Sequence, residues 1–195
     1  GVSYIKTDTE TRGLYSLCVE KQEVLIEKLK ENGGRNILVI STCNRTEVYC
    51  ENLGWGDLMD ALSQVSGGPI DILREKAFVK SGLEAVQHLF SVGCGLDSQI
   101  VGDCEIIGQV KKSFTLSKEL KVAKVLLDRL VSLVIKASKR IKSETQLSTG
   151  ATSVAFSGVQ YIRDQVEDLG GKKILLYGIG KMGRNTCENL VKHSK

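Results

Sequence analysis

The sequence predicts an α/β protein, in which an α+β domain with a small mixed sheet and packed helices is followed by the first βα unit of a second domain. Short β-branched apolar runs alternate with amphipathic helical stretches. The length of 195 residues allows one full domain and at most part of another. A glycine-rich loop follows an apolar run near the end of the chain. We expect the first domain over residues 1–145, a linker helix over 146–170 and the start of the second domain over 171–195.

The composition excludes several classes of protein. Apolar residues make up 42% and charged residues 26% of the chain, and no apolar run approaches the roughly 18 residues of a membrane span. A transmembrane or disordered protein is therefore not expected. The net charge of +4 permits an anionic partner without requiring one. The six cysteines and two histidines lack zinc-site spacing, and no secretory signal opens the chain, so we expect reduced thiols and a cytoplasmic location.

Periodicity places the elements of the first domain in order. The predicted strands, from short apolar or alternating runs, are Val2–Ile5, Asn36–Ser41 and Thr46–Glu51. The predicted helices are Val19–Lys30, Gly56–Val65, Gly82–Val92 and a long stretch, Gln109–Ser143, broken near Ser117. Because strands and helices alternate without a parallel-sheet motif, we expect a mixed sheet with helices on one side.

The second domain begins with a phosphate-loop pattern. A helix over Thr152–Val166 and a strand over Lys173–Tyr177 precede Gly178, Gly180 and Gly183, and a further helix, Arg184–Lys192, follows. A strand, three glycines and a helix in this order are typical of the dinucleotide loop of a Rossmann domain. The acidic ribose-binding residue of such a domain would lie about 20 residues further on, past Lys195. We therefore expect the chain to be the front part of a longer protein.

The first candidate site is the polar loop Thr42-Cys43-Asn44-Arg45 between two predicted strands. Loops at the edge of a buried sheet often carry binding and catalytic residues. Cys43 is either a nucleophile, with the positive charge of Arg45 favouring its thiolate, or a small core hydrophobe. Arg45 offers a fork of donors that suits a carboxylate, and its alternative is a surface arginine paired with Glu47 or another acid.

Two further groups have both a functional and a structural interpretation. His88 lies on an apolar helix, where a histidine acts in catalysis or is a hydrogen-bonded structural group. The segment from Gly95 to Gln109 either lines a pocket with Asp97 and Ser98 or forms a loop with tight turns. Four basic residues form a solvated helix face or a phosphate-binding patch: Lys136, Lys139, Arg140 and Lys142.

Six blocks in order resemble the glutamyl-tRNA reductase family. The first is Ser41–Tyr49 (STCNRTEVY), which looks like the signature around the active-site cysteine of that family. The others are His88-Leu-Phe, the blocks from Gly95 to Val110, Lys139–Thr145 (KRIKSET), Ala151–Ala155 (ATSVA) and the final glycine loop. Together they extend through nearly the whole chain and are far more specific than any single motif.

The resemblance implies an NADPH-dependent enzyme that reduces glutamyl-tRNA to glutamate 1-semialdehyde, the first step of five-carbon tetrapyrrole biosynthesis. Cys43 would be the nucleophile that holds glutamate as a thioester, and His88 an acid/base or orienting group. Thr42, Arg45 and Ser98 would bind the substrate, and Gly178, Gly180 and Gly183 the cofactor. The resemblance further implies a homodimer for the full-length protein, glutamate-1-semialdehyde aminomutase as a candidate partner, and no membrane association. Without the rest of the family's nucleotide domain, this chain is not expected to show full reductase activity.

Two stretches of the chain depart from the family pattern. Ile5-Lys-Thr-Asp8 replaces a His-Lys-Thr-Ala-Pro run, and Gly102-Asp-Cys-Glu105 replaces Gly-Glu-x-Gln, which puts any pocket role of Asp103 or Glu105 in doubt. Two alternative functions also stay open. One is a tRNA-binding or regulatory module with a structural Cys43, which the basic helix supports. The other is a dehydrogenase acting on a small molecule, which only the glycine loop supports.

Overall fold

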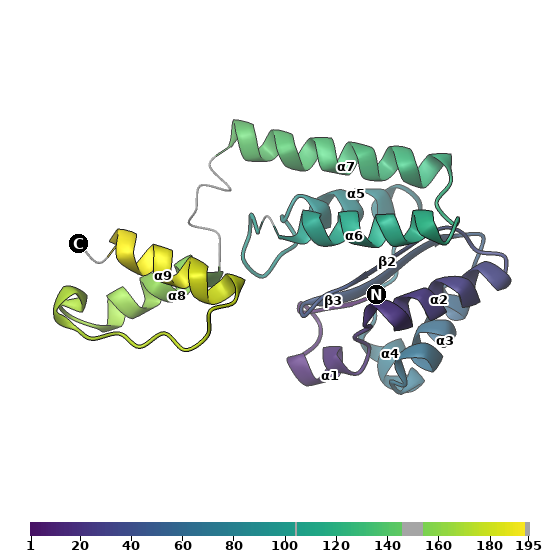
Figure 1. The fold of residues 1–195 in the computed structure, drawn as a ribbon. Helices are drawn as coiled ribbons and strands as arrows, with labels where there is room; N and C mark the ends of the chain where they lie inside the picture. The colour runs from purple at the N-terminus through teal and green to yellow at the C-terminus, as the bar shows by residue number, and fades with distance from the viewer. Residues whose placement is uncertain (104, 146–153, 194–195) are drawn as a thin grey trace.

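A three-stranded antiparallel sheet lies at the centre of the N-terminal part of the computed structural model, which describes residues 1–103, 105–145 and 154–193 (Figure 1). The strands are β1 (Val2–Ser3), β2 (Arg35–Ser41) and β3 (Arg45–Glu51), in the spatial order β1-β3-β2. β2 and β3 form a hairpin that pairs Ser41 with Thr46. The predicted mixed sheet is wrong, because the three-residue connection between β2 and β3 permits a hairpin and is too short for a parallel crossover.

Helices cover both faces of this sheet, as Figure 1 shows. Ile37 and Val39 of β2 join one apolar core, and Leu38 and Ile40 join the other. The helices that contribute to the first core are mainly α2 (Val19–Glu31), α3 (Trp55–Ser66) and α4 (Ile70–Lys76). Those of the second core are α5 (Gly82–Gly93), α6 (Ile106–Glu119) and α7 (Val125–Glu144). The prediction of helices on one side is therefore wrong, because both faces of β2 are apolar and each must be covered.

Most predicted elements of this part form within a few residues of their expected bounds. The long helical stretch is indeed two helices, but the break lies at residues 120–124, after the predicted Ser117. At this break Lys121 has a positive φ of 59°, and the N–H groups of Val122 and Ala123 donate to the Ser117 carbonyl. The sequence patterns missed α1 (Thr9–Gly13) and α4, which are too short to show a helical repeat.

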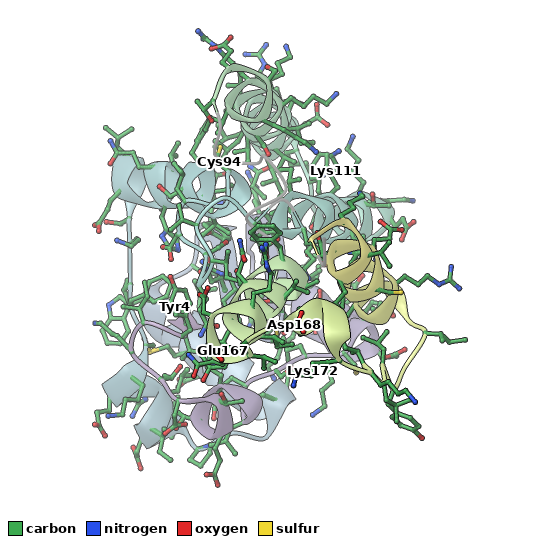
Figure 2. The ribbon with its side chains drawn as sticks, turned by 90° about the vertical axis from the view of Figure 1, so that its left-hand side faces the viewer. Tyr4, Cys94, Lys111, Glu167, Asp168 and Lys172 are labelled. Carbon is green, nitrogen blue, oxygen red and sulfur yellow. The ribbon has the colours of Figure 1, made fainter. Side chains whose placement is uncertain are left out.

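The C-terminal part consists of α8 (Val154–Gln165), a short 3-10 turn (Leu169–Gly171) and α9 (Lys181–His193). α8 and α9 lie against each other, and Figure 2 shows Glu167, Asp168 and Lys172 in the segment that follows α8. The first part of the predicted linker, residues 146–153, lies outside the described residues. None of the helices in the described segments combines the length and apolar character needed to cross a bilayer.

The predicted strand Lys173–Tyr177 does not form, although the helix after it does. The side chains of Leu175 and Tyr177 are 91% and 101% exposed. A strand needs a neighbour to accept and donate its backbone hydrogen bonds, and the described residues place no strand beside this segment. The structure therefore contains the glycine loop and the helix of the expected βα unit, but the Rossmann sheet is not shown.

Candidate active site

The Cys43 loop, defined as residues Thr42 to Asn44, is a closed turn at the end of the β2–β3 hairpin. The Thr42 hydroxyl accepts hydrogen bonds from the N–H groups of Asn44 (3.1 Å) and Arg45 (3.2 Å), and the Thr42 N–H donates to the Arg45 carbonyl (2.8 Å). A threonine that bonds the backbone two and three residues on holds a turn in one conformation. The thiol of Cys43 is exposed at its tip. The core-hydrophobe interpretation of Cys43 is therefore wrong.

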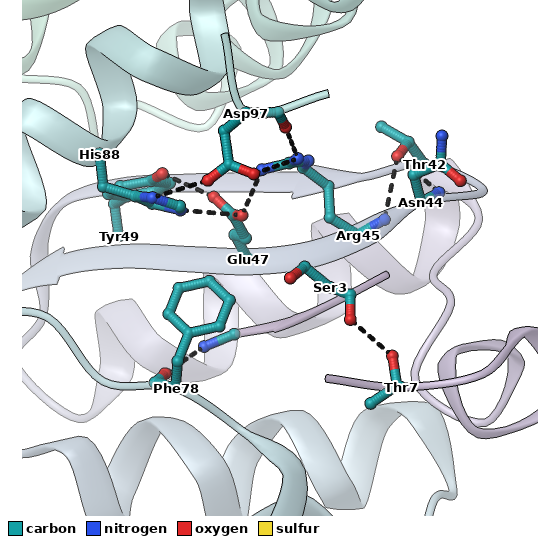
Figure 3. A network of polar contacts seen from close by, with 11 residues as sticks. Ser3, Thr7, Thr42, Asn44, Arg45, Glu47, Tyr49, Phe78, His88 and Asp97 are labelled. Carbon is teal, nitrogen blue, oxygen red and sulfur yellow. Dashed lines mark hydrogen bonds and ion pairs between the residues drawn. The ribbon is translucent and has the colours of Figure 1, made fainter. Parts of the chain in front are cut away.

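Directly after this loop, β3 directs three polar side chains toward the same face of the sheet. Arg45, Glu47 and Tyr49 are two residues apart, and successive side chains of a strand alternate between faces. Arg45 and Glu47 are each only 2% exposed. Figure 3 shows their side chains meeting His88 of α5 and Asp97 of the segment after it.

Arg45 uses both terminal nitrogens of its guanidinium to contact two carboxylates within the fold. Its Nη1 lies 2.9 Å from Glu47 Oε1, and its Nη2 lies 3.3 Å from Asp97 Oδ1 and also donates to the Asp97 carbonyl. The alternative interpretation was a surface arginine paired with Glu47. The pairing with Glu47 is confirmed, but the surface position is wrong, because Arg45 is buried. The predicted contact of Arg45 with substrate would require it to exchange one of these partners.

His88 is held between the same two carboxylates. Its Nε2 lies 3.0 Å from Glu47 Oε1, and its Nδ1 lies 3.4 Å from Asp97 Oδ2. The edge of the ring also meets Phe78, with 5.0 Å between ring centroids. Because both nitrogens face carboxylates, neither is directed at Cys43. The geometry resembles an orienting or structural histidine more than a proton carrier for the thiol.

We call four side chains the polar cluster: Arg45, Glu47, His88 and Asp97. Their charges and hydrogen bonds shift the pKa values of Glu47 and Tyr49. Burial alone would raise the pKa of Glu47, but the hydrogen bond with His88 and the charge of Arg45 outweigh it and hold that pKa below its usual value. The pKa of Tyr49 is raised well above its usual value by burial and by Glu47, whose Oε2 accepts a 2.6 Å hydrogen bond from the phenol. No buried side-chain nitrogen or oxygen in the described part of the chain lacks a partner.

Of the other predicted site residues, Ser98 is half-buried and directly follows Asp97, so it lies beside the polar cluster. Thr42 uses its hydroxyl to close the Cys43 loop. Glu105 is exposed at the start of α6, and its N–H donates to the Asp103 carboxylate (2.9 Å), while residue 104 lies outside the described residues. The structure thus places Thr42, Cys43 and Arg45 together at one end of the hairpin, and Arg45 and His88 share the partners Glu47 and Asp97.

The sequence patterns did not identify Glu47 and Asp97 as joint partners of Arg45 and His88. The signal for Glu47 was present, since Arg45, Glu47 and Tyr49 alternate along a strand and must share a face. Asp97 lies 52 residues from Arg45 and joins the polar cluster only through the packing of α5 on the sheet. No local pattern reports such a contact.

Two cavities lie near the site, and Cys43 lines neither of them. One, of about 480 Å³, follows residues 47–51 of β3, where β1 no longer pairs, and includes Trp55, Val86 and His88 in its lining. The other, of about 420 Å³, lies between α2 and α6 and includes Ser41 and Gln109. Cys43 is exposed and lies outside both cavities, an arrangement that suits a substrate too large to enter a closed pocket. The described residues contain no group that could hold a metal ion.

Two of the three predicted cofactor glycines, Gly178 and Gly183, occupy positions that favour glycine. Gly178 has a positive φ of 118°, and a Cβ at Gly183 would overlap the Gly178 carbonyl. The N–H of Arg184 donates to the Gly180 carbonyl (3.0 Å), which starts α9 directly after the loop. Glycines that permit a tight turn and close packing before a helix fit a dinucleotide.

Comparison with known proteins gives this geometry a family. The family described as glutamyl-tRNAGlu reductase, N-terminal domain, matches residues 1–145. Curated glutamyl-tRNA reductases from Flavobacterium psychrophilum and Christiangramia forsetii are each 50% identical to this chain over all 195 residues, which correspond to 47% of each relative. The chain therefore spans about half the length of the curated relatives it matches.

The fold is similar to that of a solved member of the same family. The structure of glutamyl-tRNA reductase from Methanopyrus kandleri superimposes with a TM-score of 0.68 at 28% sequence identity, covering 98% of this chain and 45% of that one. The dehydrogenase interpretation, which only the glycine loop supported, left residues 1–145 unexplained, and the family match accounts for them. The chain belongs to the glutamyl-tRNA reductase family.

Proposed function

We propose that this chain performs the acyl-transfer half of glutamyl-tRNA reduction, with Cys43 as the nucleophile. The observation that carries the proposal is the exposed thiol at the tip of a hydrogen-bonded hairpin loop, directly beside a buried polar cluster. The relatives that match the whole chain are named glutamyl-tRNA reductase, which supplies the substrate class. An exposed thiol is accessible to the end of a tRNA.

In the proposed reaction, the Cys43 sulfur attacks the carbonyl carbon of the glutamyl ester. A carbon–sulfur bond forms, the bond to the ribose oxygen breaks, and the tRNA leaves with a free hydroxyl that takes up the proton lost by the thiol. The thioester that remains on Cys43 is a better hydride acceptor than the oxygen ester, because sulfur donates less electron density to the carbonyl. NADPH supplies the hydride when it is bound, and Gly178, Gly180 and Gly183 would hold its phosphates. With that hydride on the thioester carbon and the carbon–sulfur bond broken, the product would be glutamate 1-semialdehyde, and one proton from water would restore the Cys43 thiol.

The polar cluster has an orienting role in this proposal. His88 holds Glu47 and Asp97 in place, since both of its nitrogens face their carboxylates. The ion pair of Arg45 with Glu47 holds the start of β3 in place, and Arg45 lies two positions from the nucleophile. Asp97 is the more exposed of the two Arg45 partners, with 19% of its side chain accessible, so it is the one that a substrate carboxylate would displace. Ser98 and Thr42 complete the proposed substrate contacts.

The test is to incubate the chain with glutamyl-tRNA and measure the mass of the intact protein. We expect an adduct of glutamyl mass on the wild type, its absence in Cys43→Ser, and its slow loss as free glutamate. Cys18→Ser is the matched control, because Cys18 is also exposed, and it should keep the adduct. An adduct that persists in Cys43→Ser, or no adduct on the wild type, would contradict the proposal. We expect little reduction by this chain alone.

The nucleic-acid module makes a different prediction in the same assay. Lys136, Lys139, Arg140 and Lys142 are exposed along α7, as a phosphate-binding face requires, although Arg140 also pairs with Glu144 at 2.9 Å. A module of that kind would bind uncharged tRNA with a steep salt dependence and be indifferent to Cys43→Ser. The two-domain division at residues 145 and 170, a homodimer and an aminomutase partner stay predictions for the longer protein.

A further inference from the structure

The side chain of Arg12, on α1, connects the N-terminal segment to the backbone of the proposed nucleophile. Its Nε donates to the Cys43 carbonyl (3.3 Å), its Nη1 to the Thr7 carbonyl (2.5 Å) and its Nη2 to the Thr9 hydroxyl (3.3 Å). All three guanidinium nitrogens are therefore used, on acceptors from three places in the chain. We infer that Arg12 is a positioning residue for the Cys43 loop, an inference that rests on the proposed function.

A second hydrogen bond from the same segment supports the Cys43 loop at the next residue. The Tyr4 N–H donates to the Asn44 carbonyl (3.0 Å). The internal bonds of the loop engage the hydroxyl and N–H of Thr42 and the N–H groups of Asn44 and Arg45, so they leave the carbonyls of Cys43 and Asn44 to this outer segment. Residues 4–12 thus hold the tip of the hairpin from outside the sheet.

The N-terminal segment is itself fixed, which makes it a firm support. The Thr7 hydroxyl donates to the Ser3 carbonyl (2.7 Å), and Ser3 belongs to β1, which pairs with β3. Asp8 caps the start of α1, and its carboxylate accepts the N–H of Thr11 (2.7 Å). Arg12 therefore links the Cys43 backbone to a turn that is hydrogen-bonded to β1 of the same sheet. The Cys43 loop is thus supported both by its own internal bonds and by this outer segment.

The contacts of Arg12 require a guanidinium rather than any cation. Arginine presents five donors in a planar fork, whereas a lysine ammonium is a single point charge on a flexible stem. Lysine at this position could reach one of the three acceptors but could not join them. Small displacements of a reacting group reduce the rate of an oriented reaction about a hundredfold per ångström, so loss of this anchor should lower the rate of acyl transfer rather than substrate affinity.

The experiment compares Arg12→Gln and Arg12→Lys with the wild type in single-turnover acylation by glutamyl-tRNA, followed by intact mass. For Arg12→Gln we expect the maximal rate to fall about tenfold or more, with the half-saturating concentration of glutamyl-tRNA unchanged. Arg12→Lys should lie between this variant and the wild type. Arg74→Gln is the matched control. Arg74 lies on α4 and forms an exposed pair with Asp60 of α3 (3.4 Å), so this variant should be acylated at the wild-type rate.

Two outcomes would overturn the role of Arg12: a wild-type rate in Arg12→Gln, or a loss confined to the half-saturating concentration, which would make Arg12 a substrate contact. A second measurement is independent of the reaction with tRNA. The rate of alkylation of Cys43 by iodoacetamide is compared with that of Cys18 in the same molecule by peptide mass. We expect this ratio to differ from the wild-type value in Arg12→Gln, because the Cys43 carbonyl loses its bond from Arg12 and the loop that presents the thiol is less firmly held.

The alkylation ratio also separates failure of this inference from failure of the proposed function. If the wild type forms no glutamyl adduct, the proposed function is wrong, and the ratio still tests whether Arg12 controls the Cys43 loop. If the wild type forms the adduct and a folded Arg12→Gln matches it in rate and in ratio, only the role of Arg12 is wrong. Circular dichroism establishes folding of each variant, and Arg12→Lys provides the test should Arg12→Gln not fold.

Discussion

At the scale of single residues, Glu47 joins the parts of the polar cluster. One oxygen accepts from Arg45 (2.9 Å) and lies 3.0 Å from His88, and the other accepts from Tyr49 (2.6 Å). Breaking a buried ion pair by removing one partner is strongly destabilising, because the remaining charge stays buried without full compensation. Arg45 would then depend on Asp97 alone.

We therefore expect Glu47→Gln to lower the free energy of unfolding at pH 7 by about 3 kcal/mol. Urea denaturation followed by circular dichroism measures this change. Glu84→Gln is the control, since Glu84 forms an exposed pair with Lys80 (2.6 Å) and should change stability by less than about 1 kcal/mol. Equal effects of the two substitutions would contradict the importance of the polar cluster.

The same variant has a predicted pH dependence. The folded state holds the pKa of Glu47 below its usual value, so the contribution of Glu47 to stability is complete above about pH 4.5 and is lost as the pH falls through the folded-state pKa. Glutamine has no proton to gain. The stability difference between the wild type and Glu47→Gln should therefore shrink below about pH 4.5, and a difference that grows on acidification would contradict this assignment.

At the scale of elements, the crossing of α5 and α7 depends on the absence of a side chain at Gly93. A Cβ at Gly93 would overlap Cγ1 of Val134, which is fully buried in the second core. α5 carries His88, so the depth at which this helix packs sets the position of the imidazole over β3. The same helix crossing thus positions both the core and the polar cluster.

Gly93→Ala should lower the free energy of unfolding by about 2 kcal/mol, because overpacking forces a shift of the helix or of Val134. Gly108→Ala on α6 is the matched control, since nothing lies within 4 Å of its added Cβ. Alanine favours helix formation over glycine, so this control should be neutral or stabilising by up to about 1 kcal/mol. Thermal unfolding of the two variants measures the difference, and the same loss in both would exclude the steric explanation.

At the scale of the whole molecule, the two parts of the chain differ in how well they cover their apolar surface. The sheet of the first part has a core on each face, whereas Leu175, Tyr177 and Ile179 are more than 80% exposed in the second. In the longer proteins of this family, further strands beside this segment would satisfy its backbone and cover these side chains, as we propose for the Rossmann sheet.

Limited proteolysis should reveal this difference. We expect brief treatment with chymotrypsin to cut first next to Leu175 or Tyr177, because these side chains are exposed in a segment without regular structure. Tyr15, which is fully buried, should resist cleavage until the first part unfolds. Mass measurement of the fragments identifies the sites, and a first cut within residues 1–145 would contradict the prediction.

Local patterns in the sequence were sufficient to predict most of the elements and the family. Hydrophobic periodicity is a local property, so it placed β2, α2, α5 and α9 within a few residues of their bounds, and the ordered motifs placed Cys43 in its family context. The glycine pattern also fell where glycine is favoured, because Gly178 has a positive φ and a Cβ at Gly183, in the first turn of α9, would overlap the Gly178 carbonyl.

The way in which these elements meet became visible only in the folded molecule. It made the sheet antiparallel with helices on both faces, enclosed Arg45 between Glu47 and Asp97, and brought Arg12 to the carbonyl of Cys43 across 31 positions of sequence. The physical reason is that periodicity reports which side of an element is buried but not what buries it. That choice depends on how the whole chain closes around two cores at once.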